Sequence, residues 1–166
     1  MFGDEKGDAP ALEWEWVDER LRACEDYWLV SAPSGGDVGG TGGTPAPRPV
    51  WGVWLDGRLL LTVGSPAHWR NVGENPRVAV TTGDAHDVVI VEGDATTEED
   101  PAALAAMVAA YNPKYGWDFP ETGPDIGGVI SVAPTKVLGW VTAPNAEAKT
   151  SPFPVKAARW VPVSEP

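Results

Sequence analysis

The sequence is poor in the residues that build metal and disulfide sites. Its 166 residues include one cysteine and two histidines. Cys24 alone cannot close a disulfide within the chain, and one cysteine with two histidines argues against a transition-metal site. A Ser-His-Asp triad would need His68 or His86, and neither lies in a recognisable nucleophile motif. We therefore expect no metal site and assign no catalytic residue.

Positive charge and long apolar runs are also scarce. Twelve Lys and Arg stand against 24 Asp and Glu, which gives a net charge of −12 at pH 7. This field would repel a nucleic-acid backbone, so nucleic-acid binding is disfavoured. No apolar run approaches the roughly 18 residues of a membrane-spanning helix, and the acidic N-terminus lacks the pattern of a signal peptide. We expect a cytoplasmic protein with no membrane segment.

What the sequence has in abundance is Trp, Gly and Pro, with nine, 19 and 17 residues. This composition favours short strands, tight turns and a pocket for a planar group. We expect a disordered or extended tail at 1–13 and one domain at 14–166, with a Gly/Pro-rich loop at 33–47. Helices are predicted at 14–26, 67–72 and 100–111, and an aromatic loop at 112–127. Strands are predicted at 27–31, 48–54, 58–63, 76–82, 87–95, 129–132, 136–141 and 157–161.

The pair Asp56-Gly57 predicts a tight hairpin, which excludes a parallel crossover at that point. Short strands that are apolar at most positions favour a small closed barrel, because closure removes exposed edges. The strand at 87–95 has almost no polar interruption, so we place it in the middle of the sheet.

The segment GSPAHWRN (64–71) is the candidate anion site. It follows a strand and opens a helix, whose first turn offers backbone N–H groups and a positive dipole end. Ser65 can add a hydroxyl, and His68 and Arg70 lie nearby in the sequence. The alternative is an ordinary capped helix with a solvated arginine. The Gly-rich run at 35–43 lacks this strand-to-helix context and is interpreted as a loop.

The segments YWLVS, PVWGVWLDGRLLLTVG, RNVGENPRVAVTT and DVVIVEGDA, followed by AAYNPKYGWDF and a late RW, resemble the pyridoxamine 5′-phosphate oxidase-like flavin-binding split barrels. The resemblance spans residues 14–160. It implies a mainly β (α+β) fold, a six-stranded antiparallel split β-barrel with peripheral helices. It also implies a homodimer that binds FMN, or the deazaflavin F420, at the dimer interface.

The resemblance also implies site residues. The strand segment that includes Arg48, Val50 and Trp51 would follow the flavin ring, and Arg48 would bind the cofactor. Leu61 and Thr62 would line its ribityl and phosphate side. In the family a Ser-Arg-Lys run grips the phosphate, whereas this chain has Pro66, Ala67 and His68, so both cations are missing unless His68 is protonated. The other implied cofactor-binding residues are Ser65, Arg70 and Asn71, with Trp140, Arg159 and Trp160 from the partner subunit.

These observations leave three hypotheses open. The first is an FMN-binding oxidoreductase, with an F420-dependent enzyme as its variant, acting on a small-molecule substrate that the sequence does not identify. The second is a non-catalytic module that binds flavin or haem through a degenerate phosphate site. The third is a structural dimer whose cleft is filled, with Trp69 as the candidate plug. For each Trp, packing in the core or at the dimer interface is the alternative to ligand binding.

Overall fold

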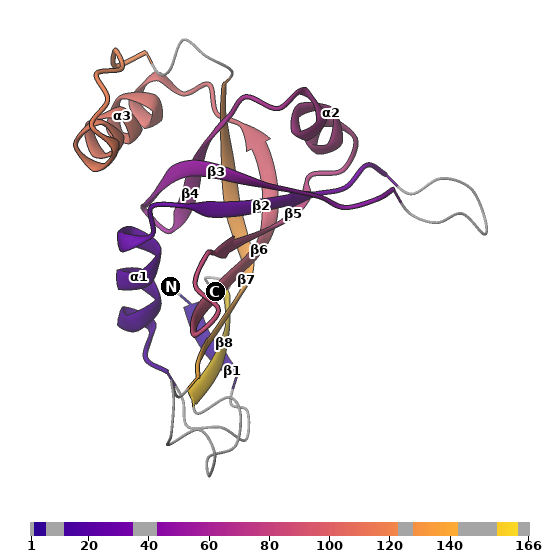
Figure 1. Ribbon diagram of the computed structural model, residues 1–166, viewed down its shortest axis with the longest axis vertical. Helices are drawn as coiled ribbons and strands as arrows, with labels where there is room; N and C mark the ends of the chain where they lie inside the picture. Colours follow the sequence, from indigo (N-terminus) through magenta and orange to yellow (C-terminus); the bar gives the residue numbers. More distant parts are fainter. Residues whose placement is uncertain (1, 6–11, 35–42, 123–127, 143–155, 163–166) are drawn as a thin grey trace.

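The structure, a computed structural model, describes residues 2–5, 12–34, 43–122, 128–142 and 156–162 (Figure 1). Within these residues it has a sheet of eight strands, accompanied by helices. The helices are α1 (Trp14–Ala23), α2 (Pro66–Glu74) and α3 (Pro101–Tyr115). The strands are β1 (Phe2–Glu5), β2 (Tyr27–Ser31), β3 (Ala46–Leu55), β4 (Arg58–Val63), β5 (Arg77–Thr82), β6 (Asp87–Thr97), β7 (Gly128–Val141) and β8 (Lys156–Pro162).

Six of these strands close into a barrel. The hydrogen-bonded order is β2–β3–β4–β7–β6–β5, and β5 pairs with β2 to complete the ring. Every pairing in the ring is antiparallel. Strand β8 extends the sheet from β7, and β1 pairs with β8 outside the ring. The predicted mainly β fold, a six-stranded antiparallel split barrel with peripheral helices, is confirmed, and β6 lies between two neighbours as expected.

The tight hairpin between β3 and β4 is also confirmed. Asp56 and Gly57 have φ angles of 47° and 75°, the left-handed backbone that a type I′ turn requires at both central positions. This turn fixes the register of the two strands, which places Trp51 directly opposite Thr62. These two side chains therefore share one face of the sheet.

The strand β7 corrects the prediction of two short strands at 129–132 and 136–141. The structure has one continuous strand, Gly128–Val141. Its first half pairs with β4 and its second half with β8, so the segment around Pro134 has β6 as its only strand neighbour among the described residues. A proline is tolerated there because its missing N–H faces an unpaired edge. The register shifts between Glu92 and Gly93 opposite this point, which absorbs the irregularity.

The barrel interior holds the main core. In β2 the side chains of Tyr27, Leu29 and Ser31 are buried, with more exposed residues between them. Helix α1 lies beside the barrel (Figure 1) and buries Val17 and Leu21 against it. The helix ends at Ala23 rather than at the predicted residue 26, because Cys24 already has an extended backbone.

Helix α3 corrects the prediction at its C-terminal end. It runs to Tyr115, so the first four residues of the predicted aromatic loop are helical. Pro113 lies in its last turns, and Gly116 ends it with a φ of 68°, the left-handed conformation that glycine adopts most easily. A second, smaller core joins this helix to the barrel. It contains Val53, Leu60, Met107, Tyr111 and Val129.

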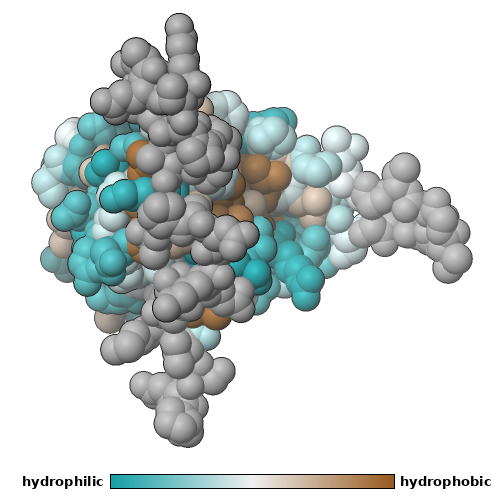
Figure 2. All heavy atoms as spheres, turned by 90° about the horizontal axis from the view of Figure 1, so that it is seen from below, coloured by the Kyte–Doolittle hydropathy of each residue, from teal (hydrophilic) through white to brown (hydrophobic). Residues whose placement is uncertain are grey.

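Strand β1 lies within the predicted tail and was not predicted, and most of the predicted loop at 33–47 lies outside the described residues. No helix in the described ranges is long and apolar enough to cross a membrane. In Figure 2 the described surface is largely hydrophilic, and hydrophobic residues show near the middle of that face. The predicted turn at 83–87 links β5 to β6.

Candidate functional site

An aromatic pocket lies on the outside of the barrel, where α3 and the loop after it meet β3 and β4. The pocket has a volume of about 200 Å³. Two of its walls are half-exposed indoles, Trp51 at 42 % and Trp117 at 44 %. No charged side chain lines it among the described residues. Its lining residues are Trp51, Thr62, Val63, Gly64, Tyr111, Trp117 and Phe119.

The aromatic rings around this pocket form two stacked pairs. Trp51 stacks on Tyr115 with ring centroids 5.4 Å apart and planes 16° apart. Trp117 stacks on Phe119 at 5.1 Å and 7°. Trp51 and Trp117 meet at 6.2 Å with their planes tilted by 51°. A pocket between such flat, uncharged walls suits a planar group.

Helix α3 is fastened to β3 beside this pocket. The Tyr115 hydroxyl accepts a hydrogen bond from the Gly52 N–H at 3.1 Å and lies 2.6 Å from the Glu25 carbonyl oxygen, to which it donates. Lys114 Nζ donates to the Gly52 carbonyl at 3.0 Å and lies over the Tyr27 and Tyr115 rings. Burial lowers the pKa of Lys114 and raises that of Tyr115. These contacts hold Tyr115 in place to support Trp51.

The loop after α3 is held by one side chain. Asn112 Nδ2 donates to the Phe119 carbonyl, and Asn112 Oδ1 accepts from the Phe119 N–H, both at 3.0 Å. This reciprocal pair closes the loop, so Trp117 and Phe119 are presented beside the pocket. The sequence identified the loop as aromatic, but no local signal showed that it reaches Trp51. The site residues that sequence reasoning missed are Tyr111, Lys114, Tyr115, Trp117 and Phe119.

On the barrel strands, the structure brings two of the implied site residues to this pocket. Trp51 and Thr62 lie on the outer face, where the Thr62 hydroxyl donates to the Trp51 carbonyl and lies 3.2 Å from the Tyr111 hydroxyl. Val50 and Leu61 are buried in the barrel core, with exposures of 9 % and 0 %. These two support the strands from inside and present no side chain at the surface.

The start of α2 follows the pocket directly along the chain. Gly64 lines the pocket, and Ser65 is the N-cap residue of α2. The Ser65 side chain makes no capping hydrogen bond. Trp69 does not line the pocket: its indole N–H donates to the Val63 carbonyl at 2.9 Å, and its ring lies against Gly128. In the described chain, Trp69 is therefore not the plug of the aromatic pocket.

His68 and Asn71 lie on the buried side of α2. His68 is fully buried, and its Nδ1 is 2.6 Å from the Ser31 hydroxyl on β2. Asn71 Nδ2 donates to the same Ser31 oxygen at 3.1 Å. Burial, and secondarily the charge of Arg48, lowers the pKa of His68. At the position where the family pattern has a cation, this chain therefore has a buried imidazole whose lowered pKa disfavours the charged form.

The two arginines near this region are exposed. The Arg48 guanidinium donates to the Pro47 carbonyl at 2.7 Å, and its positive charge helps to lower the pKa of His68. Arg70 is exposed on α2. Neither Arg48 nor Arg70 lines the aromatic pocket.

The implied residues at the far end of the barrel lie on β7 and β8. Trp160 is 2 % exposed and packs edge-on against Trp14, with ring centroids 5.6 Å apart and planes at 72°. Its ring also covers Gly139, where an added Cβ would come within 3.1 Å. Trp160 is thus a core residue of its own chain. Trp140 is partly buried on β7 and Arg159 is exposed on β8.

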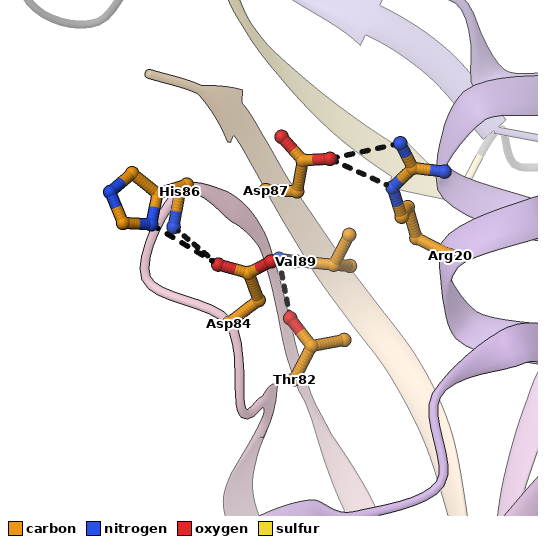
Figure 3. Close-up of polar contacts among 6 residues, drawn as sticks. All are labelled: Arg20, Thr82, Asp84, His86, Asp87 and Val89. Carbon is orange, nitrogen blue, oxygen red and sulfur yellow. Dashed lines mark hydrogen bonds and ion pairs between the residues drawn. The ribbon is translucent and has the colours of Figure 1, made fainter. Parts of the chain in front are cut away.

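His86 lies apart from these residues, in the β5–β6 turn (Figure 3). Its backbone N–H donates to Asp84 Oδ1 at 2.7 Å, and the ring lies beside the same carboxylate. Arg20 of α1 pairs with Asp87 at 2.9 Å across the same turn. His86 is exposed, as expected, and no group of metal ligands occurs among the described residues.

A larger pocket of about 530 Å³ lies elsewhere, along β2, β5 and β6. It is lined by Ser31 and by charged residues of both signs, among them Arg77 and Asp94. It lacks the aromatic walls of the first pocket, so we place the candidate site at the aromatic pocket and the start of α2.

The sequence profile named "Pyridoxamine 5'-phosphate oxidase" matches residues 17–141. The chain belongs to this family. The match runs from α1 to the end of β7 and so includes the whole barrel, the aromatic pocket and α2. No curated protein shows significant similarity to this pyridoxamine 5′-phosphate oxidase family member.

Solved structures share the fold of this family member. A conserved hypothetical protein from Mycobacterium tuberculosis has a TM-score of 0.62 at 17 % identity and covers 86 % of this chain and 95 % of its own. A FAD-binding protein from Mesorhizobium loti has a TM-score of 0.56 at 15 % identity, covering 98 % and 99 %. A structure described as an F420 reductase has a TM-score of 0.50 at 23 % identity, covering 70 % and 90 %.

Proposed function

We propose that the protein is an oxidoreductase that binds FMN at the aromatic pocket, with F420 as the alternative cofactor. One observation carries the proposal: the pocket beside the Trp51 and Trp117 rings is also lined by Thr62, Val63 and Gly64, and the next residue in the chain, Ser65, is the N-cap of α2. A flat-ring site is thus followed by a helix N-terminus that suits an anion. A flavin nucleotide has the same order, a planar ring and then a phosphate.

The residues of the pocket fit the ring. A flat, uncharged group that lies against the half-exposed indoles would remove their apolar area from water, which favours binding by about 25 cal/mol per Å². The hydroxyls of Thr62 and Tyr111 can hydrogen-bond to polar atoms at the ring edge or on the ribityl chain.

The fit is weaker at the phosphate end. Ser65 offers a hydroxyl that makes no capping bond, and Arg70 and Arg48 offer exposed guanidiniums. His68 adds no charge there because it is buried and neutral. A phosphate that approaches a chain of net charge −12 therefore meets fewer cations than in the family pattern.

A homodimer is part of the proposal. Sites for small molecules and cofactors are typically about 300–1,000 Å³, whereas the aromatic pocket of one chain holds about 200 Å³. One chain alone does not enclose a flavin, so a second copy would complete the site. Trp140 and Arg159 remain the proposed contributions of that partner, and we place the enzyme in the cytoplasm.

When bound, a flavin or deazaflavin supplies the hydride or electron chemistry itself. The chain would bind and orient the ring through Trp51 and Trp117, hold the sugar chain through Thr62, and exclude water with the aromatic loop. The names "F420 reductase" and "FAD-binding protein" of the similar structures support a cofactor of this class. The substrate is a small molecule of unknown identity.

The first test is the visible spectrum of the purified protein, followed by fluorescence titration with FMN, FAD and F420. We expect one of them to bind at micromolar concentration or below. Trp51→Leu should weaken ring binding by about tenfold, since one base-sized stacking contact contributes about 1–3 kcal/mol. Trp28→Leu is the matched control, because Trp28 is 42 % exposed, like Trp51, but does not line the pocket.

The dimer is tested separately, by light scattering over a range of concentrations. A monomer that binds FMN tightly would contradict the two-chain site. If no flavin or deazaflavin binds the wild-type protein, the proposed function fails, although the fold does not.

A second candidate function follows from the shortage of cations at the phosphate end. The protein would then bind flavin or haem without turnover. Reduction of any acceptor with NAD(P)H or reduced F420 would exclude this candidate, whereas tight binding without turnover would support it.

A further inference from the structure

The buried polar cluster of Ser31, His68 and Asn71 joins α2 to β2. Ser31 comes from β2, and the other two residues come from the inner side of α2. All three side chains are at least 97 % buried, with exposures of 1 %, 0 % and 3 %. His68 lies three residues beyond Ser65, the N-cap of α2. The hydrogen bonds of the cluster therefore link the first half of α2 to β2, as the bond from Trp69 to the Val63 carbonyl links it to β4.

The hydrogens of this cluster can be assigned from its hydrogen bonds. The amide nitrogen Asn71 Nδ2 can donate a hydrogen bond but cannot accept one, so Ser31 Oγ is the acceptor in their contact at 3.1 Å. The Ser31 hydroxyl hydrogen is then free to donate to His68 Nδ1 at 2.6 Å. In this arrangement His68 carries its hydrogen on Nε2 and is neutral. The opposite tautomer would leave the Ser31 hydroxyl hydrogen without an acceptor among the described residues.

The surroundings of His68 also favour the neutral form. The ring is fully buried, and burial disfavours a charged imidazole. Arg48 on β3 is the charged group whose field reaches the ring, and its positive sign acts in the same direction. No carboxylate of the described residues pairs with His68.

Two atoms of the cluster have no partner in the described part of the chain, His68 Nε2 and Asn71 Oδ1. With the tautomer above, the first is a buried donor and the second a buried acceptor. A buried pair of this kind is the typical site of an internal water. Neither atom is accessible to a ligand at the surface.

We propose that His68 is a positioning residue rather than a phosphate cation: held by Ser31 and Asn71, it fixes the start of α2 on β2 and so sets where Ser65 meets the anionic end of a ligand. This inference rests on the proposed function. It differs from the pattern that the family resemblance implies, in which a cation at this position grips the phosphate directly.

The test compares His68→Asn with His68→Leu. The asparagine variant keeps an acceptor for the Ser31 hydroxyl and cannot become charged between pH 5.5 and 8. The leucine variant removes the bond between His68 and Ser31 and leaves the bond from Asn71 to Ser31. The probes are FMN and riboflavin, which differ only in the phosphate. Ser34→Ala is the control, because Ser34 is exposed and donates to the Glu74 carbonyl at the other end of α2.

We expect His68→Leu to weaken FMN binding by about tenfold, the effect of one lost positioning hydrogen bond, and to change riboflavin binding by less than about twofold. His68→Asn should stay within about threefold of wild type for both. The FMN affinity of wild type and of His68→Asn should depend on pH in the same way. Titration of the FMN phosphate affects both proteins equally, so it cancels in this comparison.

A phosphate cation would give the opposite result. Wild type would then bind FMN more tightly than His68→Asn as the pH falls below about 6.5, and this excess would be absent for riboflavin. Equal losses of FMN and riboflavin in His68→Leu would also overturn the inference, because they would indicate general damage to the fold.

A second measurement applies even if the leucine variant does not fold. NMR of the ¹⁵N-labelled imidazoles reports the tautomer and the pKa of each histidine in the wild-type protein. The chain has two histidines, and exposed His86 serves as the internal reference. The inference requires an Nε2–H tautomer for His68 with a pKa below the ordinary histidine value of 6.5. If wild type binds no flavin, the proposed function fails, whereas the tautomer still tests the cluster.

Discussion

Tyr115→Phe tests the anchor between α3 and β3. The phenol hydroxyl accepts from the Gly52 N–H at 3.1 Å and donates to the Glu25 carbonyl at 2.6 Å. Phenylalanine removes both bonds but keeps the ring that stacks on Trp51. The Gly52 carbonyl keeps Lys114 as a donor, and the exposed Glu25 can bind water. The change therefore leaves one part-buried backbone N–H without its partner.

An unsatisfied group of this kind destabilises a protein by about 1–3 kcal/mol. Because Gly52 is only part-buried in this contact, we expect a loss of about 1–2 kcal/mol in the free energy of unfolding. For a domain of this size that corresponds to a fall in Tm of roughly 2–8 °C. Urea unfolding followed by tryptophan fluorescence measures the free energy, and the chain supplies nine Trp as probes.

Tyr111→Phe is the matched control. The Tyr111 hydroxyl lies 3.2 Å from Thr62 Oγ1, which also donates to the Trp51 carbonyl and so keeps a partner. We expect this variant to lose less than about 1 kcal/mol. If Tyr115→Phe is as stable as wild type, or no less stable than Tyr111→Phe, the hydroxyl does not fasten α3 and the anchoring argument is wrong.

Three further predictions concern stability. Trp160→Ala should lower the free energy of unfolding by about 3–5 kcal/mol in the monomer as in any dimer, because the indole is buried in its own chain; a calorimetric scan checks this. Gly93→Ala should destabilise the protein by about 1–3 kcal/mol, because the added Cβ would lie 2.4 Å from the Ala133 carbonyl oxygen. Its control is Gly73→Ala in α2, where the added Cβ meets nothing within 4 Å, and this variant should be more stable than wild type by about 0.5–1 kcal/mol. Asp18→Asn should lower the free energy of unfolding at pH 7, and the two proteins should become equally stable at low pH. The hydrogen bonds from Arg22 and Trp54 hold the pKa of Asp18 below 3.8. The stabilisation by the Asp18 carboxylate is therefore present above that value and is lost as the pH falls through the folded-state pKa. Denaturant unfolding of wild type and Asp18→Asn at pH 2 and pH 7 measures this difference in stability.

The barrel could be predicted from the sequence because its signals are local. The strand β4 was predicted with the observed bounds, 58–63, since Asp56-Gly57 marks its start and Gly64 its end. The two predicted strands at 129–132 and 136–141 failed to join because Pro134 normally ends a strand. The bulge beside it is in β7 itself, where Thr135 is the extra residue, because Gly93 pairs with Pro134 and Glu92 with Lys136. The pairing with β6 on both sides of this bulge keeps the strand continuous, and no local pattern shows that pairing.

The candidate site was harder to predict from the sequence, because its contacts join residues that are far apart in the chain. Trp51 and Tyr115 are 64 positions apart in the numbering of the chain, and Ser31 and His68 are separated by 37. The sequence named Trp51 through a family resemblance and His68 through both the GSPAHWRN segment and that resemblance, and these give positions but not protonation. It assigned His68 to the phosphate, whereas burial opposite Ser31 gives that ring a different environment.

The two halves of the site therefore differ in how they would hold a ligand. The ring half is built from stacked aromatic pairs fastened by Asn112, Lys114 and Tyr115, and its strength depends on shape and apolar area. The phosphate half has the Ser65 hydroxyl, exposed guanidiniums and a helix end, and salt screens the charged contacts among these. A chain with 24 acidic residues gains little from long-range attraction of an anion. Selection among flavins in this protein would consequently depend on the ring and on the placement of α2, rather than on the number of positive charges around the phosphate.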